Sequence, residues 1–392
     1  MTHHDIATIG EFTKLLRYWY ETDHEGFATM FDAAIENVKP LPEEAEAEVR
    51  YDWRNRTIDD LCQFFRDWDK WEPGVDSGLD YIEKFSWINY ENDYGMVFVT
   101  SGPGYRMTAL FTELQGRYMD SGESLGLVEK WKEQLGPKMD DYVVPKGGYK
   151  NFNEFFVRKV KDGRRPIDAP ADESVVVAPA DCVINMIVDD LTEETPIPVK
   201  TVTMNIRELL DGSEYADRFV GGTAVSCILM PSGYHRYHSP VAGQVVESNA
   251  GISGVYYGMR NFPELLNKGN VGYGYDYSMF EKFRRGYLLI DTGNSTHGLV
   301  GMVPVGLNSI ASVEFRPELS RVTPENPVTI AKGEEVGCFK YGGSLNILLF
   351  EKGCFPALQL LQGQRIGNFE NPKKSRSLFT GSWRTPSRRR RI

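Results

Sequence analysis

The first third of the chain carries hydrophobic residues at helical spacing. From Ile58 to Trp68 the apolar residues fall three or four positions apart, and Thr57 stands where a helix N-cap is expected. A second run, from Phe12 to Val38, mixes apolar and acidic residues with a similar period, and Pro40-Leu41-Pro42 separates the two runs. The pattern therefore predicts a helical domain over residues 1–140.

The helical region is rich in aromatic residues, which allows two interpretations. The rings could line a substrate pocket, or they could form the packed core between the helices. Their helical spacing favours the core. The residues concerned are Trp19, Tyr20, Trp53, Trp68, Trp71 and Trp87.

Near residue 141 short β-branched runs replace the helical spacing. Gly and Pro separate these runs, which is typical of strands joined by short turns. The predicted strand segments are 175–177, 183–187, 244–246, 288–290, 298–305 and 347–350. We therefore expect an α+β protein in which the helical domain precedes a strand-rich sandwich or partly closed barrel over residues 141–370.

The last segment, residues 371–392, has a different composition. It contains eight Lys or Arg residues and no acidic residue, although the whole chain has a net charge of −11. The negative total argues against general nucleic-acid binding. We expect a disordered tail that makes weak contact with anionic membrane surfaces or none.

The cysteine pattern and the chain's hydrophobicity indicate a cytoplasmic protein. The five cysteines are scattered and form no CxxC pair, so neither a disulfide framework nor a metal site is expected. The N-terminus lacks the apolar core of a signal peptide, and no stretch approaches about 18 consecutive apolar residues. A peripheral membrane location is the alternative that the basic tail leaves open.

A serine directly follows two glycines at Gly342-Gly343-Ser344, and two histidines stand three positions apart at His235 and His238. Glycine permits backbone conformations that other residues resist, so this hydroxyl can reach the carbonyl of the preceding residue. A nearby imidazole can take the serine proton. Together these segments indicate a serine that attacks its own peptide bond.

Taken singly, these features have plainer interpretations. Gly-Gly-Ser is common in hairpin turns, and a His-x-x-His pair is often structural or metal-binding. Asp181 lies in a Pro-containing turn and is, by itself, more typical of a turn residue than of a catalyst. The wider set of motifs reduces the weight of these interpretations.

Four motifs, in family order, resemble those of the phosphatidylserine decarboxylase family of pyruvoyl enzymes. They span roughly residues 145–355, and their order makes the set specific although each is weak alone. The motifs are Asn153–Phe156 with Arg158 and Arg164-Arg165-Pro166-Ile167; Val177-Ala178-Pro179-Ala180-Asp181; Tyr234 to Pro240 with Val241-Ala242-Gly243; and Lys332 to Ser344. The chain is similar to a soluble branch of the family that has an N-terminal helical extension and includes tryptophan decarboxylases.

The resemblance implies a self-processing enzyme. Ser344 would attack the carbonyl of Gly343, and the chain would separate into two associated chains, 1–343 and 344–392, with a pyruvoyl group made from Ser344 as the covalent cofactor. His238 would take the Ser344 proton and Asp181 would orient His238, as in a Ser-His-Asp arrangement. His235 would serve the mature decarboxylase. Such an enzyme holds its substrate amine as a Schiff base while the carboxylate leaves.

The substrate is open between two classes. The absence of an apolar anchor favours a free amino acid, with aromatic ones among the candidates, and phosphatidylserine, giving phosphatidylethanolamine, is the alternative. Where the family usually has Thr and Gly, this chain has Leu345 and Cys182, and the segment 283–287 lacks the Asn-Glu-Arg of phospholipid-acting members. The missing Asn-Glu-Arg argues against the phospholipid as substrate, whereas Leu345 and Cys182 leave room for a different class, a non-catalytic binding or scaffold protein on the same fold.

Overall fold

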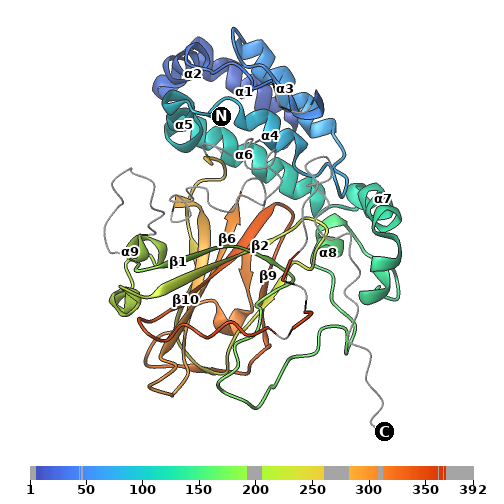
Figure 1. Cartoon of the computed structure of the whole chain (residues 1–392). Coiled ribbons are helices and arrows are strands. Elements are labelled where there is room, and N and C mark those ends of the chain that lie inside the picture. Colours follow the sequence, from blue (N-terminus) through green and yellow to red (C-terminus); the bar gives the residue numbers. More distant parts are fainter. Residues whose placement is uncertain are drawn as a thin grey trace.

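The computed structural model describes residues 6–43, 45, 47–191, 205–259, 282–307, 312–360, 362–364 and 366–367. The expected tail, residues 371–392, lies outside these ranges. Figure 1 shows the helices of the first part of the chain gathered in a layer above the strands of the second part. This arrangement confirms the expected α+β class.

Seven α-helices are described in the first part of the chain, and capping boxes begin two of them, α1 and α3. Thr57 caps α3 as expected, and Asp60 returns the contact in a capping box. The run predicted over 12–38 is two helices, because Asp23, Glu25 and Gly26 adopt positive φ angles and reverse the chain. The helices are α1 (Ile9–Glu21), α2 (Phe27–Glu36), α3 (Ile58–Lys70), α4 (Asp80–Ser86), α5 (Asp93–Thr100), α6 (Gly102–Met119) and α7 (Leu125–Leu135).

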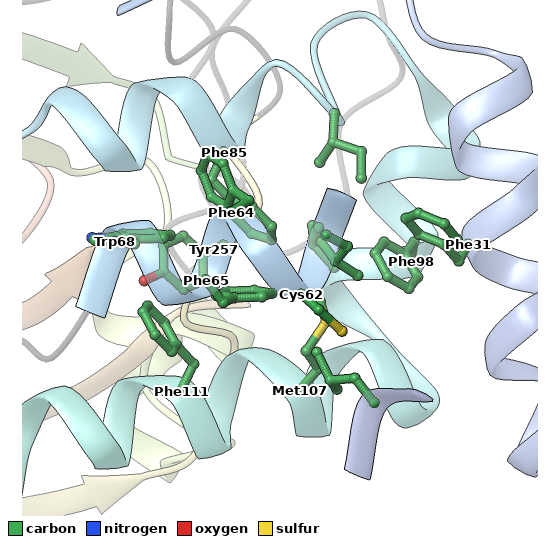
Figure 2. Close-up of a cluster of buried hydrophobic side chains, with 14 of the residues drawn as sticks. Phe31, Cys62, Phe64, Phe65, Trp68, Phe85, Phe98, Met107, Phe111 and Tyr257 are labelled. Carbon is green, nitrogen blue, oxygen red and sulfur yellow. The ribbon is translucent and has the colours of Figure 1, made fainter. Parts of the chain in front are cut away.

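Aromatic side chains fill the core of the helical layer (Figure 2). Trp19, Trp53, Trp68 and Trp87 are buried there, which confirms the core interpretation for these four residues. Tyr257 enters the same cluster from the strand-rich part, with its ring centroid 5.3 Å from that of Phe85. Burial of such large rings is worth several kcal/mol, so this contact fastens the two layers together.

Two antiparallel sheets make the second layer. The larger has the order β1-β2-β10-β6-β5-β4-β8 and the smaller the order β3-β9-β7. The strands are β1 (Val183–Asp189), β2 (Thr223–Leu229), β3 (Arg236–His238), β4 (Gly243–Ile252), β5 (Arg284–Asp291), β6 (Leu299–Leu307), β7 (Val313–Phe315), β8 (Val328–Ile330), β9 (Glu335–Phe339) and β10 (Gly343–Phe350). Two short helices accompany them, α8 (Phe152–Phe156) and α9 (Ile206–Leu209), and short 3₁₀ turns join several elements.

Most predicted strand segments are strands in the structure, and one is not. The segment 175–177 forms no strand, although the Val177 N–H donates to the Pro240 carbonyl. Strand β10 is central, between β2 and β6, and its side chains alternate between the two faces of the large sheet. Leu345 packs in one core cluster and Leu348 in the other. This alternation decides which way Ser344 points.

Candidate active site

Ser344 lies at the beginning of β10 and is 2% exposed. The strand is paired on both sides there, with Leu229 of β2 and Gly306 of β6, so the backbone at Ser344 is fixed. The residue before it must be glycine, because a Cβ atom at Gly343 would lie 2.7 Å from the Leu307 carbonyl oxygen. The peptide bond expected to be cleaved thus sits at the rigid end of a central strand.

His235 contacts this serine. Its Nδ1 atom lies 3.2 Å from Ser344 Oγ, and its Nε2 atom lies 3.0 Å from the Met230 carbonyl oxygen. A carbonyl oxygen only accepts, so Nε2 carries the ring proton and donates it to Met230. Nδ1 is therefore left without a proton and accepts from the serine hydroxyl, which is the orientation of a general base.

Burial keeps the His235 imidazole neutral. The side chain is fully buried, and the ring of Phe156 stacks on it at a centroid distance of 4.0 Å. Loss of solvent, reinforced by the nearby charge of Arg158, lowers the pKa of His235 to about 3. At neutral pH this histidine is consequently ready to accept a proton.

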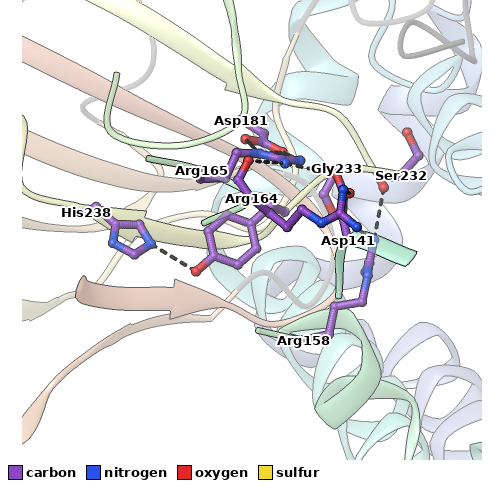
Figure 3. A network of polar contacts seen from close by, with 9 residues as sticks. Asp141, Arg158, Arg164, Arg165, Asp181, Ser232, Gly233 and His238 are labelled. Carbon is purple, nitrogen blue, oxygen red and sulfur yellow. Dashed lines mark hydrogen bonds and ion pairs between the residues drawn. The ribbon is translucent and has the colours of Figure 1, made fainter. Parts of the chain in front are cut away.

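Arg158 holds the loop that carries His235. It follows α8 and is 2% exposed, and its Nη2 atom donates to the carbonyl oxygens of Ser232 and Gly233 at 3.0 Å each (Figure 3). Its guanidinium also lies over the ring of Tyr142, 4.1 Å from the centroid. Arg158, which lies in one of the family-like motifs, therefore holds the loop of Ser232 and Gly233 in shape.

His238 faces a different environment. Its Nδ1 atom lies 2.9 Å from the Gly333 carbonyl oxygen and therefore donates, and its Nε2 atom accepts from the Tyr234 hydroxyl at 3.0 Å. Burial lowers the pKa of His238, so this imidazole is also neutral at neutral pH. Both of its ring nitrogens are occupied by groups other than Ser344.

Asp181 is bound by Arg165. The Arg165 Nε and Nη2 atoms each donate to its carboxylate at 2.8 Å, and Arg165 Nη1 reaches Asp141 at 3.0 Å (Figure 3). The two carboxylates raise the pKa of the Arg165 guanidinium above its ordinary value. Asp181, Arg165 and His238 share the wall of a cavity of about 760 Å³.

The expected contact between His238 and Ser344, with Asp181 behind it, is not what the structure shows. The reason is the direction of side chains in an extended segment, where residues three apart point to opposite faces. Only one of the two histidines can face Ser344. The Met230 carbonyl, directly after β2, fixes His235 in that position.

Sequence reasoning did not anticipate the residues that support this contact. Met230 acts through its backbone carbonyl, for which the sequence has no signal, and Phe156 lies in a family-like motif that does not reveal its contact with His235. Arg158 and Arg165 do lie in the motifs that resemble the family, and an arginine is almost never fully buried unless it is paired, so their charge is the signal that points to them.

A tyrosine next to the cleavage site joins it to the helical layer. The Tyr341 hydroxyl donates to the Gly78 carbonyl at 2.8 Å, and the Tyr341 backbone N–H donates to the Asn153 side-chain oxygen at 3.1 Å. A small cavity of about 20 Å³ adjoins Tyr341 and is bordered by Trp68 and Trp71. The helical layer therefore covers the end of β10 where Ser344 lies.

Within the ranges that the structure describes, no group of His, Cys, Asp or Glu side chains is arranged to hold a metal ion. In the same ranges no helix is long and apolar enough to cross a membrane.

Ser344 is buried and follows a glycine, and the unprotonated ring nitrogen of His235 lies at its hydroxyl, so this serine has a base within reach. The family model of phosphatidylserine decarboxylase matches residues 152–368, which include Ser344, His235, His238 and Asp181. The chain belongs to the phosphatidylserine decarboxylase family, and it is a decarboxylase, a carboxy-lyase. The non-catalytic alternative is thereby set aside.

Curated relatives match about two thirds of the chain. The phosphatidylserine decarboxylase proenzyme of Anoxybacillus flavithermus is 34% identical over 251 residues, 62% of this chain and 83% of that protein. The proenzyme of Clostridium perfringens is 30% identical over 276 residues, 70% and 84% of the two chains. Phosphatidylserine decarboxylase proenzyme 2 of Oryza sativa subsp. japonica is 30% identical over 267 residues, 67% of this chain and 39% of that protein.

Proposed function

We propose that this chain cleaves itself between Gly343 and Ser344 and becomes a pyruvoyl-dependent decarboxylase. The observation that carries this proposal is the contact between His235 Nδ1 and Ser344 Oγ, with the other ring nitrogen tied to Met230. The hydroxyl proton can pass to His235 while Oγ attacks the Gly343 carbonyl. The relatives' designation as proenzymes supports an activating cleavage.

The residues around Ser344 fit a pyruvoyl group. The group is made from Ser344 itself, at the start of a strand held on both sides, and its formation needs a base and a residue without a side chain before it. Once formed, the ketone supplies an electron sink for the carbanion that loss of carbon dioxide leaves. The chain's own part is to hold that position, to exclude water and to keep a neutral imidazole beside it.

We propose phosphatidylserine as the substrate. The comparisons support this choice, since the names of the matched relatives specify phosphatidylserine decarboxylases from bacteria and a plant. It replaces the free amino acid that the sequence favoured, for which the comparisons give no support.

A free amino acid remains the second candidate because of one observation. Tyr341 and the helical layer cover the end of β10, and the aromatic residues Trp68 and Trp71 border the adjoining cavity. A free amino acid can reach Ser344 beneath the helical layer more easily than the head group of a lipid that stays in a bilayer.

Release of carbon dioxide decides between the two substrates. Purified, cleaved protein is incubated with phosphatidylserine vesicles, serine, phosphoserine and aromatic amino acids. Release from the vesicles alone supports the lipid, and release from one free amino acid alone supports the second candidate. A Ser344→Ala variant, which cannot form the ketone, is the control for background release.

A further inference from the structure

Arg158 is a buried cation with no carboxylate bound to it among the residues that the structure describes. Its hydrogen bonds run to the carbonyls of Phe155, Ser232 and Gly233, and its guanidinium lies against the uncharged rings of Tyr142 and Phe155. Its Nε atom has no hydrogen-bond partner in the same part of the chain. A buried charge is costly unless an opposite charge or a full set of hydrogen bonds compensates it. The other arginine of the site, Arg165, has two carboxylates. Among the described residues, no negative charge therefore offsets the charge of Arg158, and its Nε–H can still donate to an anion.

The position of Arg158 connects it with the cleavage site. It binds the carbonyl of Gly233, two residues before His235, and His235 contacts Ser344 Oγ. Phe156, at the end of α8, stacks on His235 and also lies 5.3 Å from the ring of Tyr341. Arg158 and the segment that ends at Gly343 are thus each connected to His235 indirectly, Arg158 through the loop it holds and the segment through Phe156.

Self-cleavage creates one carboxylate at this place. Attack of Ser344 Oγ on Gly343 moves the acyl group from nitrogen to oxygen, and the amine nitrogen takes a proton. The resulting ester is an isomer of the chain. Removal of the Ser344 Cα proton then breaks the Cβ–Oγ bond, and Gly343 leaves as a carboxylate that keeps Oγ. The remaining enamine tautomerises to an imine, and one water molecule converts it to the ketone with release of ammonia.

We propose that Arg158 is the counter-charge of the Gly343 carboxylate, both while that group leaves and afterwards as the C-terminus of the large chain. This inference rests on the proposed self-cleavage. A cation beside a leaving anion stabilises the transition state in which the charge develops. The same contact then supplies the ion pair that Arg158 lacks in the uncleaved chain.

The substrate carboxylate is the less suitable partner. A decarboxylase must let the carboxylate lose its charge as carbon dioxide departs. An ion pair with Arg158 would stabilise the starting state more than the transition state, which slows the reaction. The Gly343 carboxylate, by contrast, gains its negative charge during the reaction. A fixed cation therefore stabilises the transition state of self-cleavage but not that of decarboxylation.

The ester stage can be measured directly. Wild type, Arg158→Met and Arg158→Lys are sampled during maturation, denatured, and treated with neutral hydroxylamine, which splits an ester but not a peptide bond. Intact-mass analysis then separates the uncleaved chain, ester-derived fragments that begin with Ser344, and finished fragments that carry the ketone. Arg285→Met is the matched control, because Arg285 is also buried and donates to the carbonyls of Leu209 and Phe283.

Arg158→Met should accumulate ester, with its conversion to the finished fragment slowed on the order of 10-fold to 100-fold. Arg158→Lys, which keeps the charge, should convert its ester faster than Arg158→Met, and Arg285→Met should show no excess ester. Normal conversion in Arg158→Met, or loss of cleavage with no ester, overturns the proposal. A wild-type chain that forms neither ester nor ketone contradicts self-cleavage itself, which separates the two failures.

A measurement on the cleaved wild type covers the case in which Arg158→Met does not fold. With glycine labelled at its carbonyl carbon, Gly343 gives the one glycine carboxylate signal of the cleaved protein. At pH 4 a free C-terminal carboxylate is already about one quarter protonated. The Gly343 signal should remain that of the ionised form there, and ordinary titration overturns the proposal.

Discussion

The Nδ1 atom of His235 lies 3.2 Å from Ser344 Oγ, and the proton of this imidazole is on the opposite nitrogen, bound to the Met230 carbonyl. One backbone carbonyl therefore fixes the tautomer that the serine needs. The two histidines of the sequence motif therefore differ in their partners. His238 donates through Nδ1 to the Gly333 carbonyl and accepts through Nε2 from the Tyr234 hydroxyl, so neither nitrogen contacts Ser344.

Replacement of His235 should stop maturation. His235→Gln removes the imidazole that accepts the Ser344 proton, and loss of a positioned base reduces rates by roughly 100-fold or more. The amount of fragment 344–392 formed over time, read by mass spectrometry, measures this.

His238→Gln is the matched substitution three residues away. It should mature at a rate closer to wild type, because His238 does not reach Ser344. If His238→Gln blocks cleavage while His235→Gln permits it, the observed contact is not the one used in the reaction.

Gly343→Ala should slow cleavage by misplacing the scissile carbonyl. The added Cβ would meet the Leu307 carbonyl oxygen at 2.7 Å, so the end of β10 must shift away from β6. Gly147→Ala is the control, since nothing lies within 4 Å of a Cβ atom there. Equal maturation rates of the two variants would show that the strand end tolerates the shift.

Asp181→Asn should weaken the fold more than the chemistry. The substitution leaves Arg165 with one carboxylate in place of two, and removing a charged partner of this kind costs roughly 1–3 kcal/mol. Urea unfolding in a Ser344→Ala background measures the loss, and the maturation rate of the single variant measures the chemistry. A maturation defect as severe as that of His235→Gln, at unchanged stability, would instead support the sequence-based role of Asp181 behind a histidine.

The depressed pKa of His235, about 3, predicts a specific pH dependence of stability. The folded state keeps this imidazole neutral, whereas the unfolded chain protonates it near pH 6.5. The contribution is present above the unfolded pKa and is lost as the pH falls toward 3.

The comparison needs two uncleavable proteins, Ser344→Ala with and without His235→Asn. Between pH 7 and pH 5 the protein that retains His235 should lose roughly 2 kcal/mol more unfolding free energy than the one that lacks it. Parallel curves over this range would mean that His235 is protonated as easily in the folded state as in the unfolded one.

The fold was predictable where local patterns decide it. The capped helix after Thr57 and the β-branched run of β10 follow from spacing and side-chain type. The left-handed residues Asp23 and Glu25, which divide the first helical run, have no comparable signal because non-glycine residues there are uncommon. Segment 175–177 has strand-forming residues but forms no strand, which shows that β propensity depends on context.

The contacts between the candidate site residues could not be predicted from the sequence. The resemblance to the family named Ser344, His235, His238 and Asp181, and the structure brings His235 rather than His238 to Ser344. The path of the chain from β2 to β3 decides which histidine faces the serine. The Met230 carbonyl on that path binds His235 and holds it toward Ser344. Such a contact between distant parts of the backbone leaves no trace in side-chain spacing.

The intact mass of the purified chain after prolonged incubation tests self-cleavage most directly. We predict two masses, one for residues 1–343 and one for residues 344–392 that is lighter by one ammonia than a fragment beginning with serine. The Ser344→Ala variant should give a single full-length mass. A single full-length mass from the wild type would contradict the account.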